Sequence, residues 1–262
     1  MEGLPQIMVA PNGARRTETD HPALPMSAGE IAITARACHD AGAGAIHLHV
    51  RDDEGQHSLD AGRYRETMAA IAEAAPEMAV QITTESAGRY TADEQYRLLR
   101  ELRPAWISLS VREMARDFAV AARVYALVKE TGTRVQHILY SQSCAEQLQQ
   151  WIGSELIREI QTDVLFVLGK YAPPVEAKPE AVSSVLAIAS KHSWNWSACA
   201  FGPHELACMV EVIMRGGCAR VGFENNIHAP DGTLLVDNAA SVILLKAAIR
   251  NMACNADQRD NT

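Results

Sequence analysis

The stretch APNGARRTETDHPALP, residues 10–25, follows the first apolar segment of the chain and decides between two α/β folds. An open doubly wound sheet carries a Gly-rich turn of the form GxGxxG directly after its first strand. Residues 10–25 form a long loop without that motif. In a closed (β/α)8 barrel, by contrast, long loops after the strands build the active site. The stretch therefore favours the barrel.

The rest of the chain alternates short apolar or β-branched segments with longer Ala-, Glu- and Arg-rich segments of helical period. Strands are expected at 6–12, 45–51, 79–85, 106–113, 134–141, 164–170, 194–202 and 220–226. Helices are expected at 27–43, 60–76, 91–104, 115–132, 144–161, 178–192, 203–217 and 236–252. Eight βα units at a mean spacing of about 30 residues are typical of a TIM barrel. Since nothing resembles a linker, we predict a single α/β catalytic domain over residues 1–262.

Local signals support these helix boundaries. Ser27 with Glu30, and Thr91 with Glu94, have the spacing of capping boxes at helix starts. Gly42, Gly132 and Gly216 end expected helices, at positions where a left-handed residue is favoured.

Bulk composition narrows the classes of partner and compartment. A net charge of −8 disfavours binding to nucleic acid or to an anionic membrane. No apolar segment is long enough to span a bilayer, and we expect no secretory signal at the start. The six cysteines show no CxxC pairing. We therefore expect a cytoplasmic protein with reduced thiols and small-molecule partners.

Polar side chains gather at the carboxyl ends of the expected strands, which is where barrel enzymes have their active sites. They are Asn12, His47, His49, Arg51, Thr83, Thr84, Glu85, Ser108, Ser110, Arg112, Gln136, His137, Arg220, Glu224 and Asn225. Strand residues two apart face the same way, so His47, His49 and Arg51 share one face. Because polar groups inside a barrel destabilise it unless they are satisfied, we expect these side chains to form one site.

Two histidines on one strand and a carboxylate on another suit a divalent cation such as Zn²⁺ with an open coordination position. His47 and His49, in HLHVRDDEGQ at 47–56, would be the imidazoles, and Glu224 the carboxylate. Two alternatives stay open. The histidines could be buried groups that bond to neighbours, and Glu224 could simply pair with Arg220.

Three motifs resemble the β-keto acid cleavage enzymes, whose best-known activity is 3-keto-5-aminohexanoate cleavage. They are HLHVRD at 47–52, QITTES at 81–86 and RVGFENNI at 220–227, and the resemblance covers essentially the whole chain. It implies a homotetrameric TIM barrel with one Zn²⁺ per subunit. Such an enzyme condenses a β-keto acid with acetyl-CoA by Claisen addition, CoA transfer and retro-Claisen cleavage, giving acetoacetate and a new acyl-CoA.

Carried over by position, the resemblance implies that His47, His49 and Glu224 bind the metal and that Arg220 is the catalytic arginine. Thr83 and Ser108 match hydroxyl positions that hold the substrate. We expect the remaining substrate contacts from Asn12, Arg51, Ser110, Arg112 and Gln136.

One residue departs from the family pattern. Many members read RVGxEDN, with an aspartate that works beside the arginine in proton transfer, whereas this chain has Asn225. Asparagine cannot take up a proton, although it can hydrogen-bond the arginine or a water. Proton transfer would then fall to another group, such as Glu85 or a metal-bound water.

The first loop bears on specificity. Arg15 and Arg16, with Arg112, predict a pocket that prefers a neutral or anionic substrate side chain over a cationic one. Equally, Arg15 and Arg16 could be solvated or bind the CoA phosphates.

Two other functions remain open. One is a metal-dependent barrel lyase that performs a retro-aldol or retro-Claisen step without acetyl-CoA. The other is a catalytically impaired barrel that only binds a ligand, which Asn225 alone favours. A Zn²⁺ hydrolase of the amidohydrolase type is disfavoured, because HxH stands on the second strand and the sixth offers only Lys170.

Overall fold

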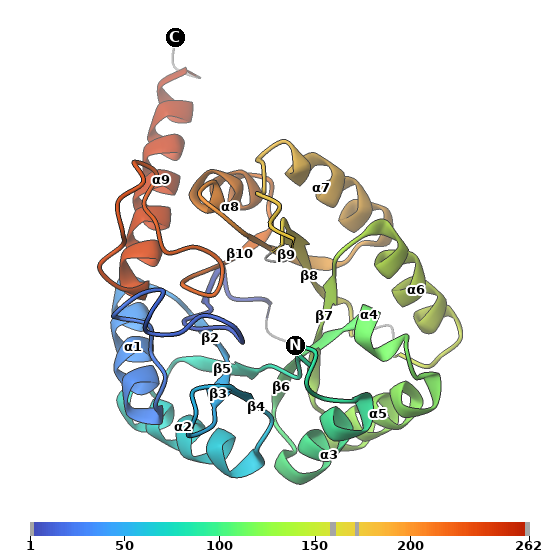
Figure 1. The fold of residues 1–262 in the computed structure, drawn as a ribbon. Coiled ribbons are helices and arrows are strands. Elements are labelled where there is room, and N and C mark those ends of the chain that lie inside the picture. Colours follow the sequence, from blue (N-terminus) through green and yellow to red (C-terminus); the bar gives the residue numbers. More distant parts are fainter. Residues whose placement is uncertain (1–2, 158–160, 171–172, 260–262) are drawn as a thin grey trace.

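A computed structural model describes residues 3–157, 161–170 and 173–259 and confirms the expected barrel. Eight parallel strands close in the order β1, β10, β9, β8, β7, β6, β5, β2, seen along the barrel in Figure 1. They are β1 (Ile7–Val9), β2 (Ala45–Leu48), β5 (Ala79–Ile82), β6 (Trp106–Ser110), β7 (Arg134–Leu139), β8 (Asp163–Leu168), β9 (Asn195–Ala200) and β10 (Cys218–Val221). Each lies within, or overlaps, an expected strand.

Helices cover the outside of the barrel (Figure 1). They are α1 (Ala28–Ala41), α2 (Ala61–Ala74), α3 (Ala92–Leu102), α5 (Phe118–Thr131), α6 (Gln142–Gly153), α7 (Ala181–His192), α8 (Glu205–Met214) and α9 (Asn238–Arg259), with the single-turn α4 (Val111–Met114) after β6. Both expected capping boxes are present. Helix α6 ends at Gly153 and not at 161; residues 158–160 of the expected helix lie outside the described residues.

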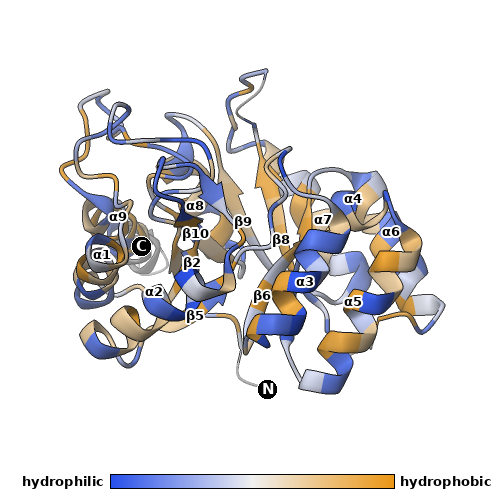
Figure 2. Ribbon diagram, turned by 60° about the horizontal axis from the view of Figure 1, so that its bottom comes forward, coloured by the Kyte–Doolittle hydropathy of each residue, from blue (hydrophilic) through white to orange (hydrophobic). Residues whose placement is uncertain are grey.

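The core has two parts, as expected of a barrel whose wall is covered on both faces. Large apolar side chains such as Tyr64, Ile71 and Leu99 fill the layer between strands and helices. Inside the barrel, Met8 and Trp106 close the lower end. Figure 2 shows hydrophilic residues gathered in the loops at the other end, where the strands finish. In the part of the chain described, no helix combines the length and apolar character needed to cross a membrane.

All eight strands end earlier at the barrel mouth than expected, and the structure shows the reason in three of them. The segment 45–51 breaks at His49, because β3 (Val50–Arg51) leaves the barrel to pair antiparallel with β4 (His57–Ser58). The segment 106–113 ends at Ser110, whose side chain caps α4. The segment 220–226 ends at Val221, where Gly222 turns the chain with a φ of 129°. A Cβ on Gly222 would lie 2.6 Å from the Ala10 carbonyl oxygen, so only glycine fits.

Candidate active site

Two histidines and one glutamate converge at the mouth of the barrel. The Nε2 atoms of His47 and His49 lie 3.2 Å apart, and Glu224 Oε2 lies 3.9 Å from the first and 3.7 Å from the second. In a tetrahedral zinc site, bonds of about 2.1 Å put neighbouring ligand atoms about 3.4 Å apart. All three residues are buried, and among the described residues Glu224 Oε2 has no hydrogen-bond partner. This donor set fits a divalent cation.

The first loop and the turn after β10 hold Glu224 in place. Gly13 has a φ of 62°, and a Cβ at this position would lie only 2.6 Å from Glu224 Cγ. The first loop can therefore pack this closely against Glu224 only because residue 13 is a glycine. The Glu224 amide donates to the Ala10 carbonyl. Glu224 thus comes from a turn, and not from a pleated strand as expected, yet it still meets Arg220, whose Nη2 lies 3.3 Å from its Oε1.

Electrostatics prepare the cluster to ligate. Burial, followed by the charge of Arg220, lowers the pKa of His47 well below its ordinary value. Burial and the neighbouring His47 lower the pKa of His49 in the same direction. Burial raises the pKa of Glu224, which the Arg220 charge opposes. Since a metal binds the neutral imidazole, both histidines are in the form that ligation needs at neutral pH.

A chain of buried side chains fixes the orientation of His47. Gln136 Nε2 donates to Ser197 Oγ at 3.0 Å, and Gln81 Nε2 donates to Gln136 Oε1 at 3.0 Å. Gln81 therefore turns its oxygen toward His47, 2.8 Å from Nδ1. Because an amide oxygen only accepts, Nδ1 carries the proton and Nε2 keeps a lone pair directed at the cluster.

A cavity of about 380 Å³ opens beside the cluster. Seven of the residues expected in the site line it: His47, Thr83, Glu85, Ser110, Arg112, Arg220 and Glu224. Glu85 accepts an ion-pair hydrogen bond from Arg15 at 2.9 Å. Arg112 lies over the Tyr140 ring, with 3.8 Å between Cζ and the ring centroid. The cavity is in the size range of small-molecule sites.

The other expected site residues do not line this cavity, among them Thr84, whose hydroxyl donates to the Ser108 carbonyl at 2.9 Å, and His137, which stacks on Tyr125. His49 reaches only the cluster, and Gln136 belongs to the chain that holds His47. The Asn12 amide donates to the carbonyls of Pro25 and His49. Arg51 turns away from the cavity and donates to carbonyls of the first loop, including that of Gly13 at 2.6 Å. Ser108 and Asn225 are buried beneath the mouth.

Of the two arginines in the first loop, only Arg15 lines the cavity. Arg15 lines the cavity and pairs with Glu85, whereas Arg16 donates to the Phe223 carbonyl at 2.8 Å and so supports the turn that carries Glu224. The sequence pattern did not separate these two roles, because the loop has no regular period.

Several functional positions were given no role in the site by the sequence analysis. Gln81 belongs to the QITTES motif but precedes the polar residues of its strand that were expected in the site. Tyr140, Lys170 and Phe201 line the cavity. All three follow the ends of β7, β8 and β9, so their position after a barrel strand was the available signal.

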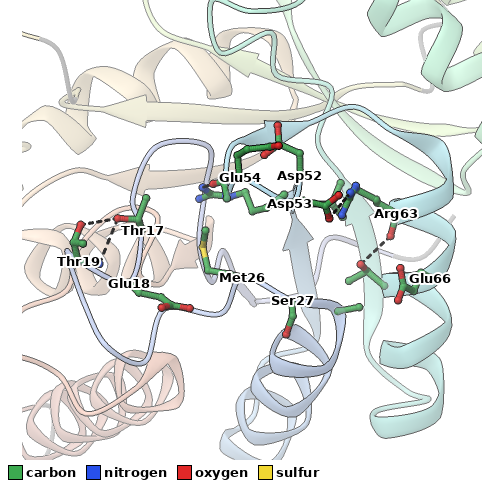
Figure 3. Close-up of a pocket in the computed structure, with 15 residues that line it drawn as sticks. Thr17, Glu18, Thr19, Met26, Ser27, Asp52, Asp53, Glu54, Arg63 and Glu66 are labelled. Atoms are coloured by element: carbon green, nitrogen blue, oxygen red, sulfur yellow. Dashed lines mark hydrogen bonds and ion pairs between the residues drawn. The ribbon is translucent and has the colours of Figure 1, made fainter.

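A larger cavity of about 550 Å³ lies between the first loop, the β3–β4 ribbon and α2. Figure 3 shows acidic side chains around it, among them Asp53, which pairs with Arg63 at 2.7 Å. Neither the ligand cluster nor Arg220 lines it. The smaller cavity at the barrel mouth is therefore the candidate active site.

Comparison with known families agrees with this geometry. The family described as beta-keto acid cleavage enzyme matches residues 6–260. The chain belongs to this family. The family predicted from the sequence motifs is thus confirmed.

Two relatives of this beta-keto acid cleavage enzyme family member act on different substrates, as their names say. The chain is 27% identical over 252 residues to the 3-keto-5-aminohexanoate cleavage enzyme of Fusobacterium nucleatum, covering 90% of this chain and 88% of the relative. It is also 27% identical over 252 residues to the 3-oxoadipate:acetyl-CoA acetyltransferase of Cupriavidus necator, covering 90% and 85%.

Among solved structures, the ternary complex of ObcA with C4-CoA adduct and oxalate has a TM-score of 0.68 to this chain at 16% identity. The match covers 88% of this chain but 65% of ObcA, so the chain spans less than two thirds of that protein. At this identity, the likeness shows the shared fold alone.

Proposed function

We propose that this protein is a Zn²⁺-dependent acyltransferase that converts a β-keto acid and acetyl-CoA into acetoacetate and a new acyl-CoA. The observation that carries the proposal is the cluster of His47, His49 and Glu224 beside Arg220 at the mouth of the barrel. In the reaction, the C2–C3 bond of the keto acid breaks and C2 bonds to the acetyl carbonyl carbon. The CoA thiol moves to the remaining acyl fragment, so atoms balance.

The proposed metal is held by two imidazoles and one carboxylate, a set typical of catalytic zinc with an open position. When bound, Zn²⁺ would supply Lewis-acid stabilisation of the enolate that the reaction requires. The chain's own groups complete the site. Arg220, buried and paired with Glu224, offers a fixed positive charge for the developing oxyanion. The Thr83 and Ser110 hydroxyls line the same cavity and can hold substrate oxygens.

Glu85 is the proposed base that removes the C2 proton. Asn225 cannot accept a proton. Glu85 lines the cavity with His47, and its side chain is 20% exposed. The Arg15 guanidinium at 2.9 Å keeps the carboxylate oriented. A carboxylate that lines the cavity in a fixed orientation can act as a general base when the substrate proton lies within its hydrogen-bond reach.

An isotope experiment tests the reaction. The metal-loaded protein is given an unlabelled β-keto acid and acetyl-CoA labelled with ¹³C in both acetyl carbons. The proposal predicts acetoacetate that contains both labelled carbons and an unlabelled new acyl-CoA. A lyase that does not use acetyl-CoA would release products without label, and a barrel that only binds would leave both reactants unchanged. Either result would overturn the proposal.

A further inference from the structure

We infer that Arg112 and Lys170 form a subsite for an anionic group at the far end of the keto acid, so that the substrate is a β-keto dicarboxylate. This inference rests on the function proposed above. It concerns the end of the substrate that does not react, which the metal cluster and Arg220 leave undetermined.

The two cations lie across the barrel mouth from the metal cluster. His47 lies on β2 and Glu224 follows β10, and β1 stands between those strands. In the ring of eight strands, β7 is opposite β1, with β6 and β8 on its two sides. Arg112 follows β6 and Lys170 follows β8, and both line the same cavity as the cluster. One ligand in this cavity can therefore reach both sides of the mouth.

The lining between the two sides is apolar. Ile138, Val167 and Phe201 line the cavity on β7, β8 and after β9. Tyr140 stands beside them and carries Arg112 on its ring face, 3.8 Å away. A short methylene chain fits such a wall, because apolar surface favours apolar groups. The substrate would therefore place its keto acid group at the metal cluster and its methylene chain along this apolar wall. Its far anionic group would then lie at Arg112 and Lys170.

Charge balance points to the same substrate. Four basic and two acidic side chains line the cavity, although the whole chain has a net charge of −8. Arg15 pairs with Glu85, and Arg220 pairs with Glu224. Within residues 3–157, 161–170 and 173–259, neither Arg112 nor Lys170 forms an ion pair. Both are exposed at the mouth, so their charges are available to a ligand.

An anion at these cations could come from the keto acid or from the CoA phosphates. The keto acid is favoured, because the apolar wall leads to the cations inside a cavity of about 380 Å³. Small-molecule sites of this size enclose most of a compact ligand. A CoA phosphate would approach the two cations from outside the cavity. If the cations bound that phosphate, removing one of them would weaken the binding of acetyl-CoA and not that of the keto acid.

The test compares three six-carbon β-keto acids at saturating acetyl-CoA, which differ in the charge of the end away from the reacting carboxylate. That end is anionic in 3-oxoadipate, uncharged in 3-oxohexanoate and cationic in 3-oxo-5-aminohexanoate. The wild type should have the highest kcat/KM with 3-oxoadipate and the lowest with 3-oxo-5-aminohexanoate. Arg112→Met should reduce the ratio of kcat/KM for 3-oxoadipate to that for 3-oxohexanoate about tenfold, since one charged hydrogen bond is lost. Lys170→Met should reduce the same ratio. The control Arg116→Met removes an exposed charge that does not line the cavity and should keep the wild-type ratio.

Preference for the neutral or the amino substrate would overturn the inference while leaving the proposed reaction intact. An increase in the KM for acetyl-CoA in Arg112→Met, with an unchanged substrate ratio, would assign the cations to the CoA phosphates and overturn it as well. If no keto acid is turned over, the proposed function fails, and calorimetric binding to the metal-loaded protein decides the subsite. Tighter binding of 3-oxoadipate than of 3-oxohexanoate, abolished by Arg112→Met, supports the subsite; equal binding overturns it.

Discussion

Histidines on the inner and outer faces of the barrel wall are equally buried but contact different side chains. His47 and His49 on the β2 side are 1% and 0% exposed, and His137 on β7 is 0% exposed. Burial lowers the pKa of all three, that of His137 to about 4. His47 and His49 face Glu224 inside the barrel. His137 is turned outward and stacks on Tyr125 of α5, with ring centroids 5.8 Å apart.

Burial and a lowered pKa therefore do not identify a functional histidine in this fold. Strand alternation decides the face, and a converging carboxylate and a cavity decide the chemistry. The inner pair is held for ligation from two directions. Gln81 fixes the His47 tautomer, and Asn12 donates to the His49 carbonyl. The outer histidine contributes to packing between β7 and α5.

The largest effect is expected for Glu224→Gln, which removes the anionic ligand from the inner set. We expect kcat/KM to fall at least ~10³-fold, because the metal supplies several kcal/mol of charge stabilisation. Acetoacetate formation measures it. Glu205→Gln is a matched control: Glu205 is also buried, and burial raises its pKa well above the ordinary value, so a neutral amide replaces it closely. Equal losses in both variants would contradict the ligand role.

Glu85→Gln should have the next largest effect. Removing a general base lowers the rate by about 10²–10⁴-fold, and we expect the loss in kcat with the metal content unchanged. Single-turnover kinetics with metal analysis of the same sample separate the two. A kcat within threefold of the wild type would exclude Glu85 as the base.

Much of this comparison could be predicted from the sequence. The motif HLHVRD predicts that His47 and His49 face the barrel interior together, because residues two apart on a strand point to the same side. Glu224 was placed on a strand, although Gly222 ends β10 and a turn carries it. Arg51 was expected at the substrate and instead binds loop carbonyls. Local period cannot predict such turns, because contacts between the first loop and the end of β10 determine them.

A smaller effect is expected for Gln81→Leu, which leaves the ligands intact but frees the His47 ring. Loss of an outer partner of a ligating histidine lowers metal affinity about 10–100-fold. Competition with a chelator measures the dissociation constant. Gln81→Glu is the conservative comparison, because its carboxylate can still accept from His47 Nδ1 and should retain most of the affinity. Wild-type affinity in Gln81→Leu would show that the chain of side chains does not orient His47.

The outer histidine is expected to have the smallest effect on the reaction, because it acts on stability alone. The pKa of His137 is about 4 in the fold, against an ordinary 6.5, so the unfolded chain binds more protons between these values. The contribution to stability is complete above pH 6.5 and is lost as the pH falls toward 4, by about 1.4 kcal/mol per unit. Urea unfolding of His137→Gln should show a correspondingly shallower decline over this window. A decline identical to that of the wild type would refute the assignment.

Metal content tests the central claim most directly, and it compares the two faces in one measurement. Wild type, His47→Ala and His137→Ala are purified in parallel and analysed by mass spectrometry for bound divalent metal. The account predicts one metal ion per chain in the wild type, none in His47→Ala, and one in His137→Ala. A wild-type protein without divalent metal, or full occupancy in His47→Ala, would contradict it.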